Sequence, residues 1–312
     1  MQSESAGSLT VVLGTGGTIA GTAARADDAV GYRAAQLGVA ELVAAVPPLA
    51  GVPLESEQVA QLDSKDMDFA TWRRLALRTA HHLARPEVGG VVVTHGTDTL
   101  EETACFLQRV LAPAKPVVLT AAMRPATALL ADGRQNLLDA VRVARESGAC
   151  GVVVAFAGRV FDAVGVRKVH GYRLDAFDAG EGGPLGVVEE GRLRRFRDWP
   201  RGSALGVGVI DVEEARWPRV DIVLNHVGAD GDAVRALVAR GADGIVVAGT
   251  GNAAVSAALE RALAEAAAAG VAVRLSTRCA AGGVVGVPGA SALSAVQARV
   301  ELILELLAAR GA

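Results

Sequence analysis

Short apolar runs rich in β-branched residues recur along the first half of the chain and limit the folds it can adopt. They are apolar at successive positions, which is typical of parallel strands buried on both faces. The runs cover residues 9–14, 88–96, 115–120 and 151–158. Amphipathic stretches between them predict helices at 68–83, 100–111 and 134–147. Strands that alternate with helices predict an α/β fold whose doubly wound sheet is covered by helices.

A stretch rich in glycine and arginine, from about Gly180 to Pro218, interrupts this alternation and predicts a hairpin and a linker. A second series of strands and helices follows it. The strands are expected at 220–227, 243–249 and 271–277, and the helices at 232–240, 253–269 and 291–310. We therefore predict two doubly wound domains. The larger N-terminal one (1–200) has a parallel or mixed sheet, a linker covers 201–218, and the smaller C-terminal one (219–312) has a parallel sheet.

The composition is that of a globular protein, with 51% hydrophobic residues, 21% charged residues and a net charge of −3. This balance predicts no nucleic-acid partner. The apolar runs fall well short of the ~20 residues that cross a bilayer, and the N-terminal residues lack the pattern of a secretory signal. We therefore expect a cytoplasmic protein without a membrane partner. The three cysteines have no paired spacing and the adjacent His81 and His82 have no i+4 partner, so neither a disulfide nor a metal site is expected.

The first predicted strand ends in a glycine-rich loop, LGTGGTIAG (13–21). Ligands of such sheets bind at the carboxyl ends of the strands, so the loop is well placed for a site. A dinucleotide-binding loop would need glycine at position 19, where this chain has Ile19. It would also need an acidic residue at the end of a second strand about 20 residues further on, and no acidic residue closes such a strand here. The loop instead favours a nucleophile, because the hydroxyl of Thr15 lies between glycines that let it move toward a carbonyl group.

The segment THGTDTLEETA (94–104) follows the second of these strands and allows two interpretations. In one, it is only a well-capped helix start, with Thr99 and Glu102 forming a capping box. In the other, backbone N–H groups at the helix start hold a substrate carboxylate or an oxyanion. Asp98 would then pair with a substrate ammonium group, close to the hydroxyl of Thr97.

Lysine is rare in this chain, which has 31 basic residues but only three lysines, Lys65, Lys115 and Lys168. A lysine that persists where arginine is the usual cation marks a position where arginine cannot serve. Lysine can lose its proton when it is buried, whereas arginine cannot. Lys168 is therefore a candidate for proton transfer, and the alternative is a surface cation within the basic stretch 167–173.

Together these segments resemble the bacterial-type L-asparaginase/glutaminase family. LGTGGTIAG and THGTDTLEETA are similar to its two signature segments, and shorter matches follow in order along nearly the whole chain, from about residue 9 to 310. The shorter matches are DSKDM (63–67), TAAMRP (120–125), DG (132–133), GVRK (165–168) and GTGN (249–252).

The resemblance implies an amidohydrolase that converts L-asparagine, and in some members L-glutamine, through an acyl-enzyme without metal or cofactor. It also implies a homotetramer built from two intimate dimers. Thr15 would be the nucleophile, assisted by Tyr32 on the mobile segment that follows, and Thr97, Asp98 and Lys168 would form a hydrogen-bonded set. The implied substrate-binding positions are Ser64 for the α-carboxylate, Asp98 for the α-ammonium group, Thr97, Lys65, Ala122 through its backbone carbonyl, and Asn252 from the second domain.

Two departures from the family pattern concern substrate choice. Lys65 occupies a position that is often an amide or a small polar residue, and the segment 276–291 lacks the glutamate that many relatives supply to a neighbouring subunit. Two other functions share the fold. An ammonia-releasing amidotransferase acting on tRNA would bring an extra N-terminal domain and a basic surface. A non-enzymatic amino-acid sensor could dispense with Thr15 or Lys168, and this chain has both.

Overall fold

The computed structural model describes residues 8–311 and separates into two compact units. The first unit ends at Val207 and the second begins at Gly208, within the stretch predicted as a linker. Each unit has its own sheet, a large mixed one in the first and a small parallel one in the second. The predicted fold class is therefore confirmed.

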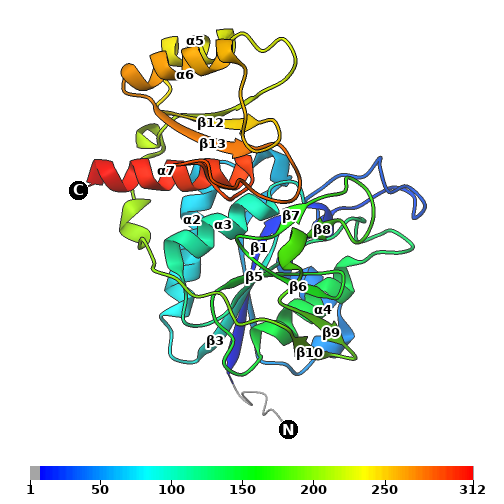
Figure 1. The fold of residues 1–312 in the computed structure, drawn as a ribbon. Helices are drawn as coiled ribbons and strands as arrows, with labels where there is room; N and C mark the ends of the chain where they lie inside the picture. The colour runs from blue at the N-terminus through cyan, green and yellow to red at the C-terminus, as the bar shows by residue number, and fades with distance from the viewer. Residues whose placement is uncertain (1–7, 312) are drawn as a thin grey trace. The chain divides into compact units, whose positions relative to one another are not determined.

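The sheet of the first unit has the strand order β10-β9-β6-β5-β4-β3-β1-β2 (Figure 1). Strands β2, β1, β3, β4 and β5 are parallel to one another. Strands β6, β9 and β10 extend the sheet beyond β5, and each is antiparallel to its neighbour. The strands are β1 (Leu9–Gly16), β2 (Leu54–Leu62), β3 (Val88–Thr94), β4 (Val117–Thr120), β5 (Val152–Phe156), β6 (Arg159–Asp162), β9 (Gly186–Glu189) and β10 (Arg192–Arg195).

The register of the parallel strands gathers three strand ends at one edge of this sheet. Gly14 of β1 lies opposite Thr94 of β3, and Thr94 lies opposite Thr120 of β4. Because parallel strands finish at the same edge, the loops after β1, β3 and β4 are neighbours although they are far apart in sequence. A further small sheet, of β7 (Arg167–Lys168) and β8 (Phe177–Asp178), belongs to the same unit.

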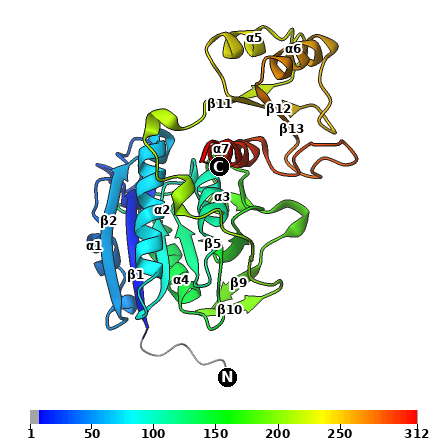
Figure 2. The same cartoon turned by 90° about the vertical axis from the view of Figure 1, so that its left-hand side faces the viewer.

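Helices cover both faces of this sheet. Helices α2 and α3 pack together over one face (Figure 2), and the rings of Trp72 and Phe106 stack between them with centroids 4.7 Å apart. Helices α1 and α4 share a hydrophobic core with the other face. Their bounds are α1 (Val39–Ala44), α2 (Phe69–Leu83), α3 (Leu100–Leu111) and α4 (Gly133–Ala144). Short 3₁₀ helices are η1 (Thr18–Ala20), η2 (Pro47–Leu49), η3 (Ser64–Asp66), η4 (Gly180–Gly182), η5 (Val207–Val209) and η6 (Glu214–Arg216).

Two local features differ from the sequence prediction. The capping box at the start of α3 is wrong, because the Thr99 hydroxyl makes no cap and donates to the Ser64 carbonyl at 2.8 Å. Strand β2 was not predicted, because its alternating polar residues hide the apolar signal. It is an edge strand, and one of its faces is tied to α2 by ion pairs such as that between Glu57 and Arg78.

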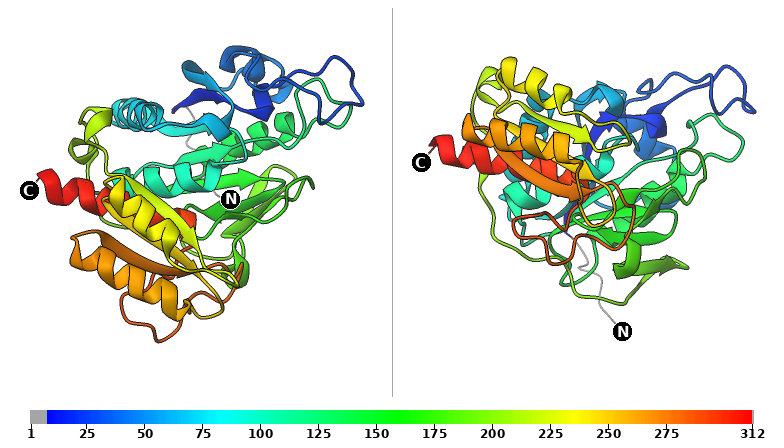
Figure 3. Two further views of the ribbon diagram at one scale, coloured as in Figure 1. Left: turned by 90° about the horizontal axis from the view of Figure 1, so that it is seen from above. Right: turned by 45° about the horizontal axis from the view of Figure 1, so that its top comes forward.

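The second unit is a parallel sheet of order β11-β12-β13 between two layers of helices. Helices α5 and α6 lie next to one another over one face (Figure 3), and α7 packs against all three strands. The elements are β11 (Val220–Leu224), α5 (Asp232–Ala239), β12 (Gly244–Gly249), α6 (Ala257–Ala268), β13 (Ala272–Thr277) and α7 (Ala295–Gly311). Across residues 8–311, no helix is both long enough and apolar enough to cross a bilayer.

Candidate active site

The structure brings Thr97, Asp98 and Lys168 together beside the start of α3. The Lys168 ammonium group donates to Thr97 Oγ1 at 2.9 Å and to Asp98 Oδ1 at 2.6 Å. Thr97 is buried, the side chain of Lys168 is 16% exposed, and that of Asp98 is 51% exposed. One hydroxyl, one cation and one carboxylate are thus in direct contact, and the carboxylate keeps an accessible side.

Ser64 joins this cluster from the 3₁₀ helix η3. Its hydroxyl oxygen accepts the backbone N–H of Asp98 at 3.1 Å. The approach depends on glycine, since a Cβ atom on Gly96 would lie 2.4 Å from Ser64 Oγ. Gly17, with a φ of 80°, meets the same segment, where a Cβ atom would lie 2.4 Å from the Gly96 nitrogen. The glycines therefore let the loops after β1, β2 and β3 pack together.

Thr15 and Tyr32 lie at the end of β1 and in the segment that follows it, and each has a partner of its own. The Thr15 side chain is almost fully buried (1% exposed), and its hydroxyl donates to the Thr94 carbonyl at 3.0 Å. The Tyr32 hydroxyl lies 2.6 Å from Thr18 Oγ1. Thr18, which the sequence interpretation left without a role, therefore holds Tyr32 in this arrangement.

Lys65 points away from the cluster although it follows Ser64 directly. Its ammonium group contacts Asp63 at 2.5 Å and Asp66 at 3.6 Å, and its side chain is 62% exposed. The hydrogen bond with Asp63 raises the pKa of Lys65 above its ordinary value. The cation is thus held by carboxylates of its own turn.

The loop after β4, which contains Ala122, is fixed by the start of α4. The Asp132 carboxylate accepts the backbone N–H groups of Met123 and Arg124, each at 2.9 Å. The Asn136 amide donates to the Ala121 carbonyl, also at 2.9 Å. Burial raises the pKa of Asp132 above its usual range. Sequence reasoning noted Asp132 only as a match to the family, and Asn136, one helical turn later, was missed.

Asn252 belongs to the second unit, where its side chain is hydrogen-bonded to the backbone of Val285. Its amide nitrogen donates to the Val285 carbonyl at 2.7 Å, and its amide oxygen accepts the Val285 N–H at the same distance. Both ends of the amide therefore hold the segment 276–291. These bonds lie within the second unit.

His95 is a buried group in the signature segment to which the sequence interpretation gave no function. Trp72 Nε1 donates to Thr103 Oγ1 at 2.9 Å, which leaves the Thr103 hydroxyl proton for His95 Nε2, 3.0 Å away. His95 Nδ1 lies 2.7 Å from the Gly96 carbonyl oxygen, which can only accept, so Nδ1 carries the ring proton. Burial lowers the pKa of His95 to about 4, and the neutral ring supports the peptide that precedes Thr97.

A second unassigned ionisable group is Glu101, in the first turn of α3. Burial raises its pKa to about 7, and the nearby Glu102 adds to this effect. The backbone of Lys168 and the positive charges of Arg167 and Lys168 oppose the shift.

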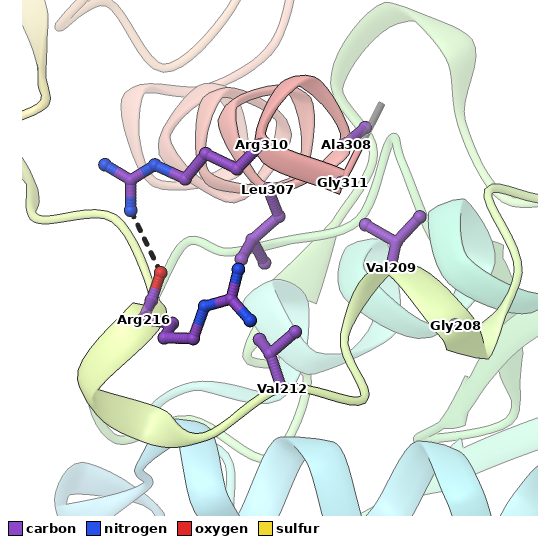
Figure 4. A pocket seen from close by; sticks show the side chains of 8 residues that line it. All are labelled: Gly208, Val209, Val212, Arg216, Leu307, Ala308, Arg310 and Gly311. Atoms are coloured by element: carbon purple, nitrogen blue, oxygen red, sulfur yellow. Dashed lines mark hydrogen bonds between the residues drawn. The ribbon is translucent and has the colours of Figure 1, made fainter.

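The second unit has a pocket of about 320 Å³ between α7 and the segment 208–216 (Figure 4). Leu307, Val209 and Val212 supply apolar walls, and Arg310 donates to the Arg216 carbonyl at 2.9 Å. The pocket contains none of the predicted site residues and no nucleophile paired with a base. The cluster of Thr97, Asp98 and Lys168 in the first unit has the hydroxyl, cation and carboxylate groups that catalysis requires, and it is therefore the better candidate site.

Two family models match consecutive parts of this chain. The family model described as "Asparaginase, N-terminal" matches residues 10–201, and the "Glutaminase/Asparaginase C-terminal domain" matches residues 219–307. A glutaminase-asparaginase from Pseudomonas fluorescens biotype A is 38% identical over 279 residues, covering 88% of this chain and 76% of that protein. L-asparaginase 2 of Bacillus subtilis is 37% identical over 273 residues, covering 86% of this chain and 72% of that protein.

A solved structure of a probable cytoplasmic L-asparaginase from Campylobacter jejuni superimposes with a TM-score of 0.90 at 36% sequence identity. The match covers 96% of this chain and 95% of that one. The ranges matched by the two family models include every predicted site residue. The chain therefore belongs to the asparaginase family.

Proposed function

We propose that the chain is an amidohydrolase that converts L-asparagine to L-aspartate and ammonia, with L-glutamine as a second substrate. Its relatives include proteins named L-asparaginase and glutaminase-asparaginase. The observation that carries the proposal is the contact of Lys168 with both Thr97 and Asp98. These groups lie at the carboxyl edge of the parallel strands, where Thr15 also ends its strand.

In the proposed reaction, Thr15 Oγ1 attacks the side-chain amide carbon. The new C–O bond gives a tetrahedral oxyanion, the C–N bond breaks, and ammonia leaves after it receives a proton. Water then attacks the resulting ester, and aspartate is released with the Thr15 hydroxyl restored. A threonine hydroxyl needs a neighbouring base, and its proton here points to the Thr94 carbonyl. Attack therefore requires Thr15 to leave that bond, and we assign Tyr32 to assist it.

Thr97, Asp98 and Lys168 are proposed to move protons and to hold the substrate. Thr97 Oγ1 accepts a hydrogen bond from the Lys168 ammonium group, so its own hydroxyl hydrogen can be donated to substrate or water. The exposed side of Asp98 suits the α-ammonium group. Ser64 already accepts the Asp98 N–H, so its hydroxyl hydrogen remains to donate to the α-carboxylate.

The remaining substrate contacts are proposed for Ala122, Lys65 and Asn252. Lys65 and Asn252 would first have to break hydrogen bonds that they make in the structure. Ala122 would hold the leaving amide nitrogen through its carbonyl group, in a loop fixed by Asp132. Lys65 would have to leave Asp63 before it could reach a substrate carboxylate. Asn252 would have to release Val285. These two residues are therefore the weakest members of the proposed set.

The likeness to the family also supports three proposals about the whole protein. We place it in the cytoplasm, as a homotetramer built from two intimate dimers, and we propose that it works without metal or cofactor. Light scattering of the purified protein measures its mass in solution. Dialysis against a chelator, followed by an activity assay, tests the independence from metal. A stable monomer with full activity would contradict the tetramer.

The experiment that tests the function is a comparison of kcat/KM on L-asparagine and L-glutamine by coupled ammonia detection. We expect turnover of asparagine, with glutamine slower, since the extra methylene displaces the amide from Thr15. Isothermal titration with L-aspartate measures binding in the same preparation. Binding without ammonia release from either amide would favour the amino-acid sensor and reject the enzyme.

A further inference from the structure

Another pocket, of about 350 Å³, lies within the first unit. It is bounded by the end of α3, the turn after β6 and the segment 197–203. Three arginines line it, Arg109, Arg197 and Arg201, and none of the predicted site residues does. Its volume is in the range of pockets that hold small molecules. It is therefore a candidate binding site separate from the site of amide hydrolysis.

Gln108, in the last turn of α3, has one end of its side-chain amide bonded and the other end open. The residue is buried (5% exposed), and its Oε1 accepts the backbone N–H of Val152 at 2.7 Å. Its Nε2 lies beside Gly202 of the pocket wall, where a Cβ atom would be 3.7 Å away. Within residues 8–311, no acceptor is hydrogen-bonded to Nε2. A buried donor without an acceptor is costly, so the pocket presents a donor that a ligand can satisfy.

Arg201 is a second donor without a partner among residues 8–311, since its guanidinium group forms no ion pair or hydrogen bond with them. The other charges of the pocket are paired differently. Arg197 donates to Asp162 at 2.9 Å, and Asp198 pairs with Arg195 at 3.2 Å. Both carboxylates of the pocket are thus bound to other arginines, and neither balances Arg201. The pocket therefore favours an anion.

The apolar part of the wall indicates which kind of anion fits. Leu185 is 3% exposed and lines the pocket together with Val164. Apolar surface of this kind stabilises a hydrocarbon chain, which inorganic phosphate lacks. A guanidinium group binds both oxygens of a carboxylate through parallel N–H bonds. We propose that this pocket binds a small organic carboxylate, whose oxygens accept from Arg201 and Gln108 Nε2 and whose carbon chain contacts Leu185 and Val164.

Butyrate is the probe for this site, because it has a carboxylate and a short carbon chain but no ammonium group for Asp98. We expect saturable binding in a ligand-observed NMR titration of the full chain. Acetate, shorter by two methylene groups, should bind about tenfold more weakly. Tighter binding of inorganic phosphate than of butyrate would overturn the assignment to an organic carboxylate. No binding of any of the three would show that only water meets these donors, and would overturn the site.

Three substitutions locate the bound probe. Arg201→Ala removes an exposed guanidinium group and should weaken butyrate binding about tenfold or more, the usual scale for a hydrogen bond to a charged group. Gln108→Glu keeps an oxygen for the Val152 N–H but replaces the amide donors by a carboxylate, so butyrate binding should be lost. Arg192→Ala, which removes an exposed arginine of β10 outside the pocket, is the matched control and should stay within about twofold of the parent.

Ser64→Ala tests whether butyrate binds instead in the proposed active site, where Ser64 is assigned to a carboxylate. We expect its butyrate affinity to equal that of the parent, and a loss would place the probe there and overturn the proposal. Parent-like binding by Arg201→Ala, or equal losses in Arg201→Ala and Arg192→Ala, would also overturn it. Thermal melting of each variant shows whether the fold is kept. Because binding is the readout, the result does not depend on whether the chain hydrolyses asparagine.

Discussion

Thr15 and Thr97 carry the same hydroxyl group at neighbouring strand ends, but their surroundings differ. The Thr15 hydroxyl is buried and donates to a backbone carbonyl, so its proton is engaged in that hydrogen bond. The Thr97 hydroxyl oxygen accepts a hydrogen bond from the Lys168 ammonium group, which also donates to Asp98. Thr15 is therefore hydrogen-bonded to the backbone, whereas Thr97 is hydrogen-bonded to an ionisable side chain.

This difference suggests a division of labour between the two. Thr15 ends a strand beside Gly16 and Gly17, both with positive φ, so the backbone there can adopt conformations that other residues resist. Thr97 is fixed between α3 and β7 by its bond to Lys168. A movable nucleophile beside a fixed proton-transfer group is the arrangement that the proposed reaction needs. The following substitutions test that comparison, from the largest expected effect to the smallest.

Removing either hydroxyl should have the largest effect. We expect Thr15→Ala and Thr97→Ala each to lower kcat by ~10³-fold or more, the scale for a nucleophile or base that acts as part of a unit. The measurement is ammonia release from asparagine. Thr71→Ala, a buried threonine in α2, is the control and should stay near the parent rate.

Mass spectrometry of acid-quenched enzyme sharpens the same comparison. With Thr97→Ala, an aspartyl ester should accumulate on the peptide that contains Thr15, because water attack on the ester is slowed. An ester on the peptide that contains residue 97 of the parent enzyme would reverse the two roles. Near-full activity of Thr15→Ala would remove it from the mechanism.

Replacing Lys168 tests whether its charge or its proton matters. Lys168→Arg keeps a cation, but arginine does not give up its proton and its planar fork does not fit the two contacts made by one ammonium group. We expect kcat to fall by about 10²-fold or more, the upper part of the range for general acid–base groups. Steady-state kinetics on asparagine provide the measurement. A loss of only a few-fold would show that Lys168 serves as a fixed charge.

Tyr32→Phe removes the hydroxyl that is bound to Thr18 in this structure. If Tyr32 assists Thr15 during attack, kcat should fall about 10- to 100-fold. Thr18→Val, which removes the same resting bond from the other side, should have a smaller effect. Equal losses in the two variants would instead show that the bond only orders the segment around Tyr32. Parallel kcat measurements distinguish the two outcomes.

The sequence predicted the parts of the site that repeat local patterns. Thr97 and Asp98 follow a buried strand and begin a helix, and both features are visible in the chain itself. The contact of Lys168 with Thr97 could not be derived from local pattern, because it joins positions 71 residues apart and depends on a two-residue strand. Long-range pairings of this kind depend on tertiary structure, which local propensity does not determine.

The scarcity of lysine proved to be a weak indicator of a role in proton transfer. Lys168 does contact the cluster, but Lys115 donates to the carbonyls of Leu83 and Arg85, where it caps the end of α2. Such a position favours a compact cation with several donors and requires no proton transfer. Lys65 lies on the surface beside Asp63. Residue type alone could not separate a chemical role from a capping role.

Lys65→Gln should have the smallest effect, and it tests whether the resting position of this cation matters. In the structure its charge is balanced by Asp63 and Asp66 and is largely in water, so its direct contribution to binding should be small. We expect kcat to be unchanged and KM for asparagine to change by about two- to threefold, the ~0.5 kcal/mol typical of exposed charges. Asp63→Asn is the matched control, because it frees Lys65 without removing it. If it lowers KM while Lys65→Gln raises it, the released cation reaches the substrate carboxylate. If neither variant changes KM or the preference for asparagine over glutamine, Lys65 does not belong to the site. Ser64 is then the only proposed substrate-binding residue of this turn.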